Sequence, residues 1–288
     1  MSVGPAVVAL GGGHGLSTTL RAVRRYARTV TAVVSVADNG GSSGRLRDTF
    51  GIPAPGDLRK CFAALGDPAL PLTEAIETRF SAGDLAGHPL GNILIAGLTE
   101  AIGSFTAALE EVGRMVGVQG RVLPATLDAV VLKAESASGE VEGQVAGANA
   151  DRITCVSLVP PDPAAPDEVV AAIVAADQVV LGPGSLFTSV LAVTAVPAIR
   201  KALATTAAHK IYICNLREQP PETTGFDVAA HIDALHAHGV MPDVVLFDPD
   251  ALALGDCQIA VVAAPVADLS RGVHDPGKLA TVLARLVG

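Results

Sequence analysis

The stretch 7-VVALGGGHGLSTTLRAV-23 is the most informative part of the sequence for the fold. An apolar run, Val7–Leu10, is followed by four glycines in five positions and then by a run with helical spacing. Glycine removes the steric barrier of a Cβ atom, so backbone N–H groups in such a loop can converge on a ligand. A helix N-terminus adds unpaired donors and partial positive charge. The pattern predicts a strand, a phosphate-binding loop and a helix.

Further apolar runs predict strands, and helical patterns separate most of them. Several runs are apolar at every position, which is typical of a parallel sheet with helices on both faces. We therefore expect an α/β fold with a doubly wound, Rossmann-like parallel sheet. The predicted strands cover 6–10, 30–36, 128–134, 153–159, 178–182, 210–216, 243–247 and 259–264, and the predicted helices cover 16–28, 58–65, 91–102, 104–117, 167–176, 185–207, 226–238 and 276–287.

Two stretches interrupt this alternation. Residues 57–120 are predicted to form a mostly helical insert, and Ser138-Gly139 is predicted to turn a β-hairpin within 121–150. Asp167 is a candidate N-cap for the helix that follows a proline-rich loop. We expect residues 1–288 to form a single domain that contains both interruptions.

Composition narrows the class of function and the location. The formal net charge of −9 argues against a broad electrostatic grip on nucleic acid. The four cysteines lie far apart without metal-site spacing, so reduced, buried thiols in a cytoplasmic protein are expected. No basic leader precedes the first strand, and no apolar run reaches the ~18 to 20 residues of a membrane span.

The first glycine loop does not match the common nucleotide motifs. In a G-x-G-x-x-G register that starts at Gly11, the last position is Leu16, which argues against a nicotinamide dehydrogenase. A Lys-Ser/Thr pair is also missing, so this is no nucleotide-hydrolysing P-loop. A tight turn would need only one glycine. The repeated glycines therefore favour contact with a ligand, and His14 lies among them.

Two further loops add candidate donors and carboxylates. Asp38 follows the second predicted strand and could bind ribose hydroxyls or Mg²⁺. We expect residues 39–44 to form a flexible, polar, anion-binding loop with Arg45 after it. Residues 182–185, "GPGS", repeat the strand–loop–helix arrangement, with Ser185 as a candidate N-cap.

Asp57 and Asn92 each leave two interpretations open. Asp57 supplies a second carboxylate, either for Mg²⁺ beside Asp38 or as an N-cap. Asn92 could contact a ligand or cap a helix. Mg²⁺ is the one cofactor these side chains indicate. No residue is assigned a catalytic role, because neither a clear nucleophile nor a paired base is visible.

The segments "GGGHGLSTTLR", "VADNGGSSGRLR", "PGDLRKC", "AGHPLGN", "LGPGSLFTSV", "KIYICNL" and "QPPETTGF" occur in this order. Together they resemble the gluconeogenesis factor family, often called YvcK-like, within the CofD-like group that also contains 2-phospho-L-lactate transferase. The resemblance runs from Val7 to about Val287. It implies a cytoplasmic protein, needed for growth and cell shape on gluconeogenic carbon sources, that binds a UDP-sugar such as UDP-N-acetylglucosamine.

The resemblance also indicates a C-terminal ligand residue, Arg271, although Gly272 and Val273 separate it from the His-Asp pair that follows. Where the family commonly has Thr in the first loop, this chain has His14. The candidate ligand-binding residues are Gly11, Gly12, Gly13, His14, Gly15, Leu16, Asp38, Asn39, Gly40, Gly41, Ser42, Ser43, Arg45, Asp57, Asn92, Gly182, Gly184, Ser185, Thr188, Asn215 and Arg271.

Two functions therefore remain in view. The first is a regulatory protein that binds a nucleotide sugar or another phosphate-bearing nucleotide and acts through a partner or as a homo-oligomer. The second is a Mg²⁺-dependent transferase of a phosphate-linked group, with Asp38 and Asp57 holding the metal. Neither needs nucleic acid or a membrane span.

Overall fold

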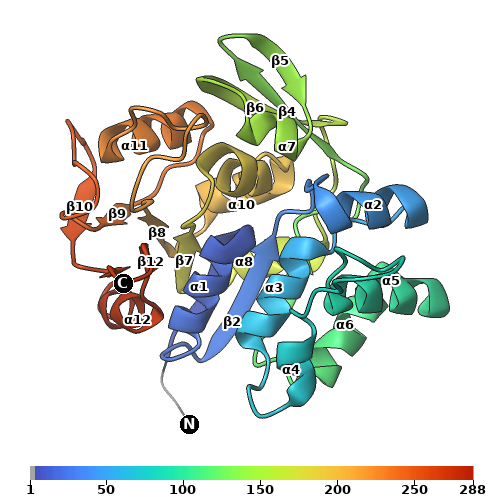
Figure 1. Cartoon of the computed structure of the whole chain (residues 1–288). Helices are drawn as coiled ribbons and strands as arrows, with labels where there is room; N and C mark the ends of the chain where they lie inside the picture. The colour runs from blue at the N-terminus through green and yellow to red at the C-terminus, as the bar shows by residue number, and fades with distance from the viewer. Residues whose placement is uncertain (1–3, 288) are drawn as a thin grey trace.

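A seven-stranded sheet lies at the centre of the computed structural model, which describes residues 4–287 (Figure 1). The strand order is β10-β9-β8-β7-β1-β2-β3, and all neighbouring strands are parallel. This confirms the predicted doubly wound α/β sheet. The strands are β1 (Ala6–Gly11), β2 (Thr29–Val34), β3 (Arg121–Pro124), β7 (Gln178–Leu181), β8 (His209–Ile213), β9 (Val244–Phe247) and β10 (Ala260–Ala263).

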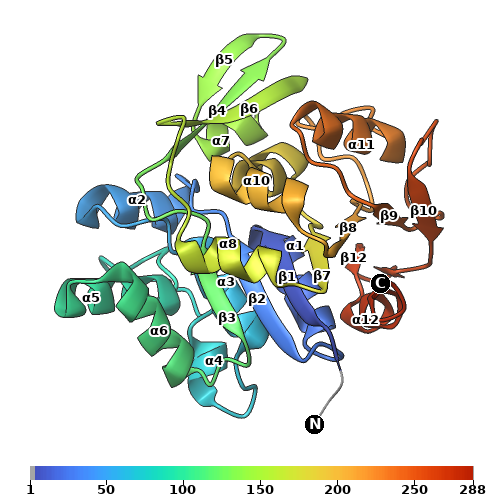
Figure 2. The same ribbon diagram turned by 180° about the vertical axis from the view of Figure 1, so that it is seen from behind.

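Helices cover both faces of the sheet. In Figure 1, α1 (Gly13–Val23), α3 (Gly56–Leu65) and α12 (Pro276–Leu283) lie in front of it. Figure 2 shows α8 (Asp167–Val174) and α10 (Pro197–Thr205) on the opposite face. The central strand β1 is buried from both sides, and Val7, Val8, Ala9 and Leu10 are each at most 3% exposed. Its continuous apolar run therefore reflects burial on two faces.

The chain between β2 and β3 is helical. It contains α2 (Gly41–Phe50) and α3, then α4 (Pro71–Ala75), α5 (Leu90–Ile102) and α6 (Phe105–Met115). The predicted hairpin is present as β4 (Val131–Ser136) and β5 (Gly139–Glu142), and β6 (Ile153–Val159) pairs with β4 to complete a small antiparallel sheet. The remaining elements are α7 (Gln144–Ala148), η1 (Leu186–Leu191), α9 (Ala192–Thr194), α11 (Val228–Ala237), β11 (Ala267–Asp268) and β12 (Val273–His274).

Several sequence predictions are wrong in detail. Residues 41–44, expected in a flexible loop, begin helix α2, whose Leu46 packs with Ile52 and Ala96. The predicted helix 185–207 is broken before Pro197, because proline lacks an N–H group and starts α10. Asp167 lies inside α8 and makes no capping bond, since the N-cap position is Pro166.

The four cysteines are free thiols, but only Cys61 and Cys214 are buried, whereas Cys155 and Cys257 are half-buried. The expectation that all four are buried is therefore wrong for two of them. Within residues 4–287, no single helix is long and apolar enough to cross a membrane; only the bent pair Leu186–Thr194 and Pro197–Thr205, taken together, passes on length and composition.

Candidate functional site

The order of strands reverses between β1 and β7, which lie side by side at the centre of the sheet. Ligands of open parallel sheets bind at such a switch point, outside the carboxyl ends of the strands. Here the glycine loop 11–15 leaves β1 and the loop 182–185 leaves β7. A pocket of about 270 Å³ opens between them, lined by both loops, by Asn215–Arg217 and Gln219, and by Gly272–His274.

The two central loops are packed directly against each other. The Cα of Gly15 lies so close to the carbonyl oxygen of Pro183 that a Cβ atom there would overlap it. A Cβ atom on Gly12 would lie 2.5 Å from Oδ2 of Asp57 and 3.5 Å from the Cβ of Ser189. Glycine is therefore required at Gly15, where the neighbour is backbone, whereas a Cβ atom at Gly12 would displace the Asp57 side chain.

Helices α1, α2 and α3 begin without side-chain caps. Their N-cap residues are Gly12, Gly40 and Pro55, and none of them makes a side-chain capping bond. The first N–H groups of a helix have no acceptor inside the helix, and the end carries partial positive charge. Asp57 lies inside α3, so its interpretation as an N-cap is wrong.

Two contacts bring these three N-termini together. Asp57, in the first turn of α3, reaches Gly12 at the start of α1. The hydroxyl of Ser43, in the first turn of α2, lies against Gly56 at the start of α3. The three positive helix ends therefore meet at one place, which is suited to a phosphate group.

Asp38 and Asp57 are the carboxylates at this meeting point. Asp38 accepts a hydrogen bond from the N–H of Gly40 at 2.8 Å, and its Oδ2 lies close to Gly56. Burial is the largest cause that raises the pKa of Asp38, and the charge of Asp57 adds to it, while bonds from Gly40 and Ser43 oppose the rise. The two carboxylates thus lie close enough to repel each other.

These two carboxylates are a partial fit to a Mg²⁺ site. Oxygen ligands suit this ion, which commonly binds through one or two carboxylates and completes its shell with water and phosphate. Among residues 4–287, no group of three or more His, Cys, Asp or Glu side chains is placed to hold a metal. A metal here would therefore need further oxygen atoms, from water or from a phosphate-bearing ligand.

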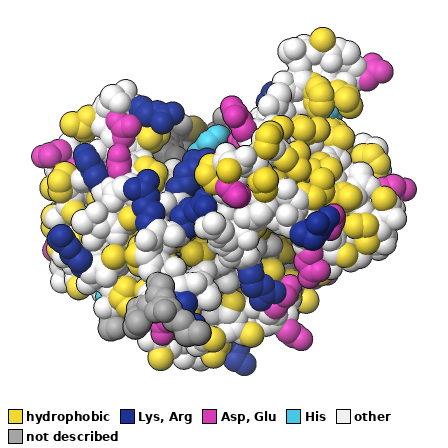
Figure 3. Space-filling view, turned by 90° about the horizontal axis from the view of Figure 1, so that it is seen from below, with side chains coloured by type: hydrophobic (Ala, Val, Ile, Leu, Met, Phe, Trp, Pro, Cys, Tyr) yellow, Lys and Arg dark blue, Asp and Glu magenta, His cyan; other side chains and the backbone are white. Residues whose placement is uncertain are grey.

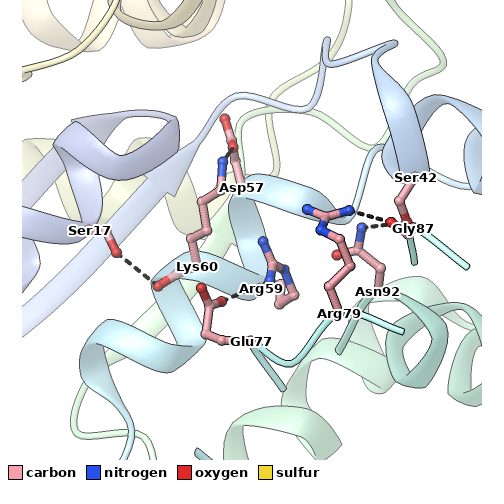
Figure 4. Close-up of polar contacts among 9 residues, drawn as sticks. All are labelled: Ser17, Ser42, Asp57, Arg59, Lys60, Glu77, Arg79, Gly87 and Asn92. Carbon is pink, nitrogen blue, oxygen red and sulfur yellow. Dashed lines mark hydrogen bonds and ion pairs between the residues drawn. The ribbon is translucent and has the colours of Figure 1, made fainter. Parts of the chain in front are cut away.

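Lys60, which the sequence reasoning missed, lies beside Asp57. Its Nζ is 3.0 Å from Oδ1 of Asp57, and the two side chains point toward each other in Figure 4. The backbone oxygen of Lys60 accepts a hydrogen bond from Ser17 of α1. Burial lowers the pKa of His14 in the first turn of α1, and the charge of Lys60 lowers it further.

Ser42 and Asn92 are brought together in a buried polar network. Asn92 Nδ2 donates to Ser42 Oγ at 3.0 Å, and Ser42 Oγ is 2.8 Å from Nδ1 of His88. Burial, followed by the charges of Arg45 and Arg79, lowers the pKa of His88. Both arginines donate to backbone oxygens of the segment 86–87 (Figure 4 shows Arg79). This network supports the first turn of α2.

The loop after β7 leads to a helix end that is already occupied. Glu222 accepts hydrogen bonds from the N–H groups of Phe187 and Thr188, at 2.8 and 3.2 Å, and from the Thr188 hydroxyl at 3.4 Å. Its burial raises its pKa, and these hydrogen bonds oppose the rise. Ser185 stands at the N-cap position but makes no side-chain capping bond.

Asn215 and Asn39 make contacts within the protein. Asn215 Oδ1 accepts from the N–H of Gly184 at 3.1 Å, so it fixes the loop beside the pocket. Asn39 Oδ1 accepts from the N–H of Val145 at 3.1 Å, which ties the end of β2 to α7. Gln144 of α7 also donates to the backbone oxygen of Thr188 at 2.8 Å.

The C-terminal segment reaches the pocket through residues other than Arg271. Arg271 lies in the turn between β11 and β12, while Gly272, Val273 and His274 line the pocket together with Arg217. The sequence did not single out Arg217, which lies between the segments KIYICNL and QPPETTGF of the family resemblance. Sequence distance hid its proximity to His274.

Basic side chains also gather at the other end of the sheet, where the strands begin (Figure 3). Arg21, Arg24 and Arg25 line a hollow of about 380 Å³ there. Arg24 Nη1 donates to the backbone oxygens of Ala64 and Gly66 at the C-terminal end of α3. A cation near a helix C-terminus stabilises the helix, so Arg24 has a structural role at the end of α3.

A hollow of about 310 Å³ lies between α6 and β3, at one edge of the sheet. Arg121 and Glu168 on its rim form an ion pair with each other. No glycine loop reaches it, so the switch-point pocket and the adjacent helix ends form the candidate site.

Comparison with known proteins gives a consistent result. Residues 7–260 match the family model described as "2-phospho-L-lactate transferase CofD". The chain is 44% identical over 305 residues to the "Putative gluconeogenesis factor" of Mycobacterium leprae, covering 97% of this chain and 85% of that one. It is 40% identical to the "Gluconeogenesis factor" of Halalkalibacterium halodurans, covering 83% and 76%. A crystal structure of a UPF0052 family member from Bacillus halodurans superposes with a TM-score of 0.90 at 34% identity, covering 96% and 97%.

Proposed function

The chain belongs to the CofD family and to its group of gluconeogenesis factor relatives, and we propose that it is a regulatory protein that binds a nucleotide sugar similar to UDP-N-acetylglucosamine. In this proposal the bound ligand controls an effect on a partner, or on assembly of a homo-oligomer, that supports growth and cell shape on gluconeogenic carbon sources. Its proposed location is the cytoplasm.

One observation carries the proposal: three uncapped helix N-termini meet beside the switch-point pocket. The meeting point offers backbone donors and positive dipole ends, which suit a diphosphate. The pocket beside it offers polar side chains, among them Arg217 and Gln219, for the uncharged parts of a ligand. A nucleoside diphosphate sugar has this combination of an anionic centre and two polar ends.

Aromatic content favours a ligand with one base over a dinucleotide. Only 3% of the residues are Phe, Trp or Tyr, and Trp is absent from the sequence. Stacking of two bases on aromatic rings is therefore not expected to supply the affinity. A nucleotide sugar replaces one base by hydroxyl groups, which hydrogen bonds can recognise.

Calorimetric titration tests the proposal directly. We expect UDP-N-acetylglucosamine and UDP to bind, while uridine and N-acetylglucosamine alone bind at least about 10-fold more weakly, because a charge-assisted hydrogen bond contributes on that scale. Binding of uridine as tight as that of UDP would contradict a site built for phosphate. Absence of binding by both phosphate-bearing ligands would overturn the nucleotide-sugar proposal.

A second candidate function is a Mg²⁺-dependent transfer of a phosphate-linked group, as in the name of the matching family. The proximity of Asp38 to Asp57 favours it. A metal held there would neutralise charge on a transferring phosphoryl group. In that case, ligand binding should weaken in a chelator, Asp38→Asn should remove the Mg²⁺ dependence, and phosphorus NMR should detect a product.

A further inference from the structure

Lys60 is an ammonium group placed among groups that all belong to the proposed phosphate site. It lies one turn into α3, and its Nζ is 3.0 Å from Asp57. Asp57 in turn reaches Gly12, the residue from which α1 begins. The hydrogen bond from Ser17 to the Lys60 carbonyl holds this part of α3 against α1. The lysine side chain is therefore positioned by both helices.

Two arginines of α2 and α3 are directed elsewhere. Arg59, the neighbour of Lys60 in sequence, pairs with Glu77 at 3.0 Å, as Figure 4 shows. Arg45 donates to the backbone oxygen of Ala86 at 3.3 Å. Lys60 is thus a cationic side chain in direct contact with Asp57, one of the two carboxylates where the helix ends meet.

The ion pair with Asp57 is poorly suited to a purely structural role. The side chains of Lys60 and Asp57 are 19% and 7% exposed, so both charges have lost much of their hydration. A buried pair commonly contributes little net stability, because desolvation offsets the attraction. By contrast, Lys133 and Glu140 form an exposed pair on the small sheet, with Glu140 62% exposed.

We propose that the Lys60 ammonium binds a phosphate oxygen of the ligand and that Asp57 is a positioning residue that holds the ammonium at the N-terminus of α1. The inference rests on the proposed function and extends it by naming the side chain that recognises the phosphate. Lys60 has three donors, so it can keep Asp57 and gain a phosphate oxygen at the same time. The first-turn N–H groups of α1 complete the contact.

The experiment compares Lys60→Met, Lys60→Arg and Asp57→Asn with Lys133→Met as the matched control. Affinities for UDP are measured by calorimetry and those for uridine by NMR titration, each with Mg²⁺ and with a chelator. We expect Lys60→Met to weaken UDP binding at least about 10-fold and to change uridine binding less than about 2-fold. Lys60→Arg should regain part of the loss, because it restores the charge, and Lys133→Met should match the unaltered chain.

The outcomes separate this inference from the proposed function. Far-UV circular dichroism and the thermal midpoint first establish that each variant folds. If Lys60→Met does not fold, Lys60→Arg is used in its place. Unchanged UDP affinity in Lys60→Met, or an equal loss for uridine and UDP, overturns the role of Lys60 while the nucleotide site stands. If Mg²⁺ fully restores the UDP affinity of Lys60→Met, the role of Lys60 is also overturned, and a metal ion binds the phosphate instead. An unaltered chain that binds no UDP overturns both.

Discussion

The N-termini of α1 and η1 follow similar glycine loops from adjacent strands, yet they differ in what they offer a ligand. β1 and β7 pair along Val7–Leu10 and Gln178–Leu181, so the two loops emerge side by side. At α1 no side chain caps the helix, whereas at η1 the carboxylate of Glu222 accepts from two N–H groups. The same pattern of strand, glycine loop and helix therefore gives one open and one closed helix end.

The difference shows that a glycine loop alone does not make an anion site. Glu222 lies 35 residues beyond Phe187 in the sequence, and its negative charge occupies the position that an anion would take. In the proposed function, an anionic ligand would therefore bind at the ends of α1, α2 and α3. The loop after β7 would then contribute a wall of the pocket, through Gly184 and Pro183, in place of a second phosphate cradle.

The largest expected effect comes from removing the group that closes η1. Glu222 is 3% exposed, so Glu222→Ala leaves two buried N–H groups without their acceptor. We expect this change to lower the free energy of unfolding by about 3 kcal/mol relative to the unaltered chain. Glu222→Gln keeps an acceptor oxygen, so it should lower the free energy of unfolding by only about 1 kcal/mol. Denaturant unfolding measures both.

The matched control is Glu100→Ala on the exposed side of α5, expected to stay within about 0.5 kcal/mol of the unaltered chain. If η1 becomes an open end like α1, inorganic phosphate should stabilise Glu222→Ala more than the unaltered chain. A loss no larger than that of Glu100→Ala would contradict a capping role for Glu222.

The sequence predicted the strands of the central sheet other than β3, because those strands carry a local signal. Val7–Leu10 and Val179–Leu181 are apolar at each position, as burial on both faces requires, and glycines mark where these strands end. Helix α2 carried no comparable signal. Glycine and serine fill its first turn and have low helix propensity, so its formation depends on packing of Leu46 and on the network around Ser42.

The candidate site was predictable where it is local and hidden where it is not. The first glycine loop, Asp38 and Asp57 all adjoin predicted strand or helix ends. Lys60 lies next to an arginine in the sequence, and only the fold shows that it turns to Asp57 while Arg59 turns to Glu77. Glu222 and His274 reach the site from distant segments, which one sequence cannot place.

A smaller effect is expected at the open end, from a single methyl group. Gly12→Ala would place a Cβ atom 2.5 Å from Asp57 Oδ2, although the backbone angle φ of −162° suits alanine. The change therefore tests close approach without backbone strain. We expect UDP affinity to fall about 100-fold, or ~2.7 kcal/mol, by calorimetry.

Gly97→Ala is the control for this change, because Gly97 is exposed within α5 and a Cβ atom there meets nothing within 4 Å. It should leave UDP affinity unchanged and raise stability by about 0.5 to 1 kcal/mol. UDP affinity that is retained in Gly12→Ala would remove the distinction between the open and closed helix ends.

The stability of the fold is expected to depend on pH through His274, which lines the pocket between the two glycine loops. Burial lowers the pKa of His274 from 6.5 to about 4, opposed by a hydrogen bond to the Cys214 backbone and by the charge of Asp248. Between these values the unfolded chain binds more protons, so stability rises with pH. Lowering the pH from 7 to 5 should remove about 2 kcal/mol through this group.

His274→Asn can still donate a hydrogen bond to the Cys214 backbone but does not titrate in this range. Unfolding measured at pH 7 and pH 5 should therefore show a loss that is about 2 kcal/mol smaller in His274→Asn than in the unaltered chain. Equal losses in the two proteins would mean that His274 becomes protonated without unfolding the chain. The pocket wall would then be more hydrated than its burial indicates.

The smallest expected effect concerns which phosphate-bearing ligand the open end prefers. Asp38 follows β2 and lies at the meeting point of α2 and α3, with Oδ1 bonded to Gly40. If its second oxygen faces ribose hydroxyls, it repels a 2′-phosphate. We expect UDP-sugars to bind more tightly than NAD, and NAD more tightly than NADP, with a gap of at least tenfold, or ~1.4 kcal/mol, between the first and the last.

A thermal-shift series with the three ligands at equal concentration measures this order, and Asp38→Asn sharpens it. Loss of the negative charge should narrow the gap between NAD and NADP while UDP-sugar binding, which has no 2′-phosphate to repel, changes less. If NADP gave the largest shift in the unaltered chain, the carboxylate of Asp38 would not face the ribose. Its main role would then be to accept the bonds from Gly40 and Ser43 at the first turn of α2.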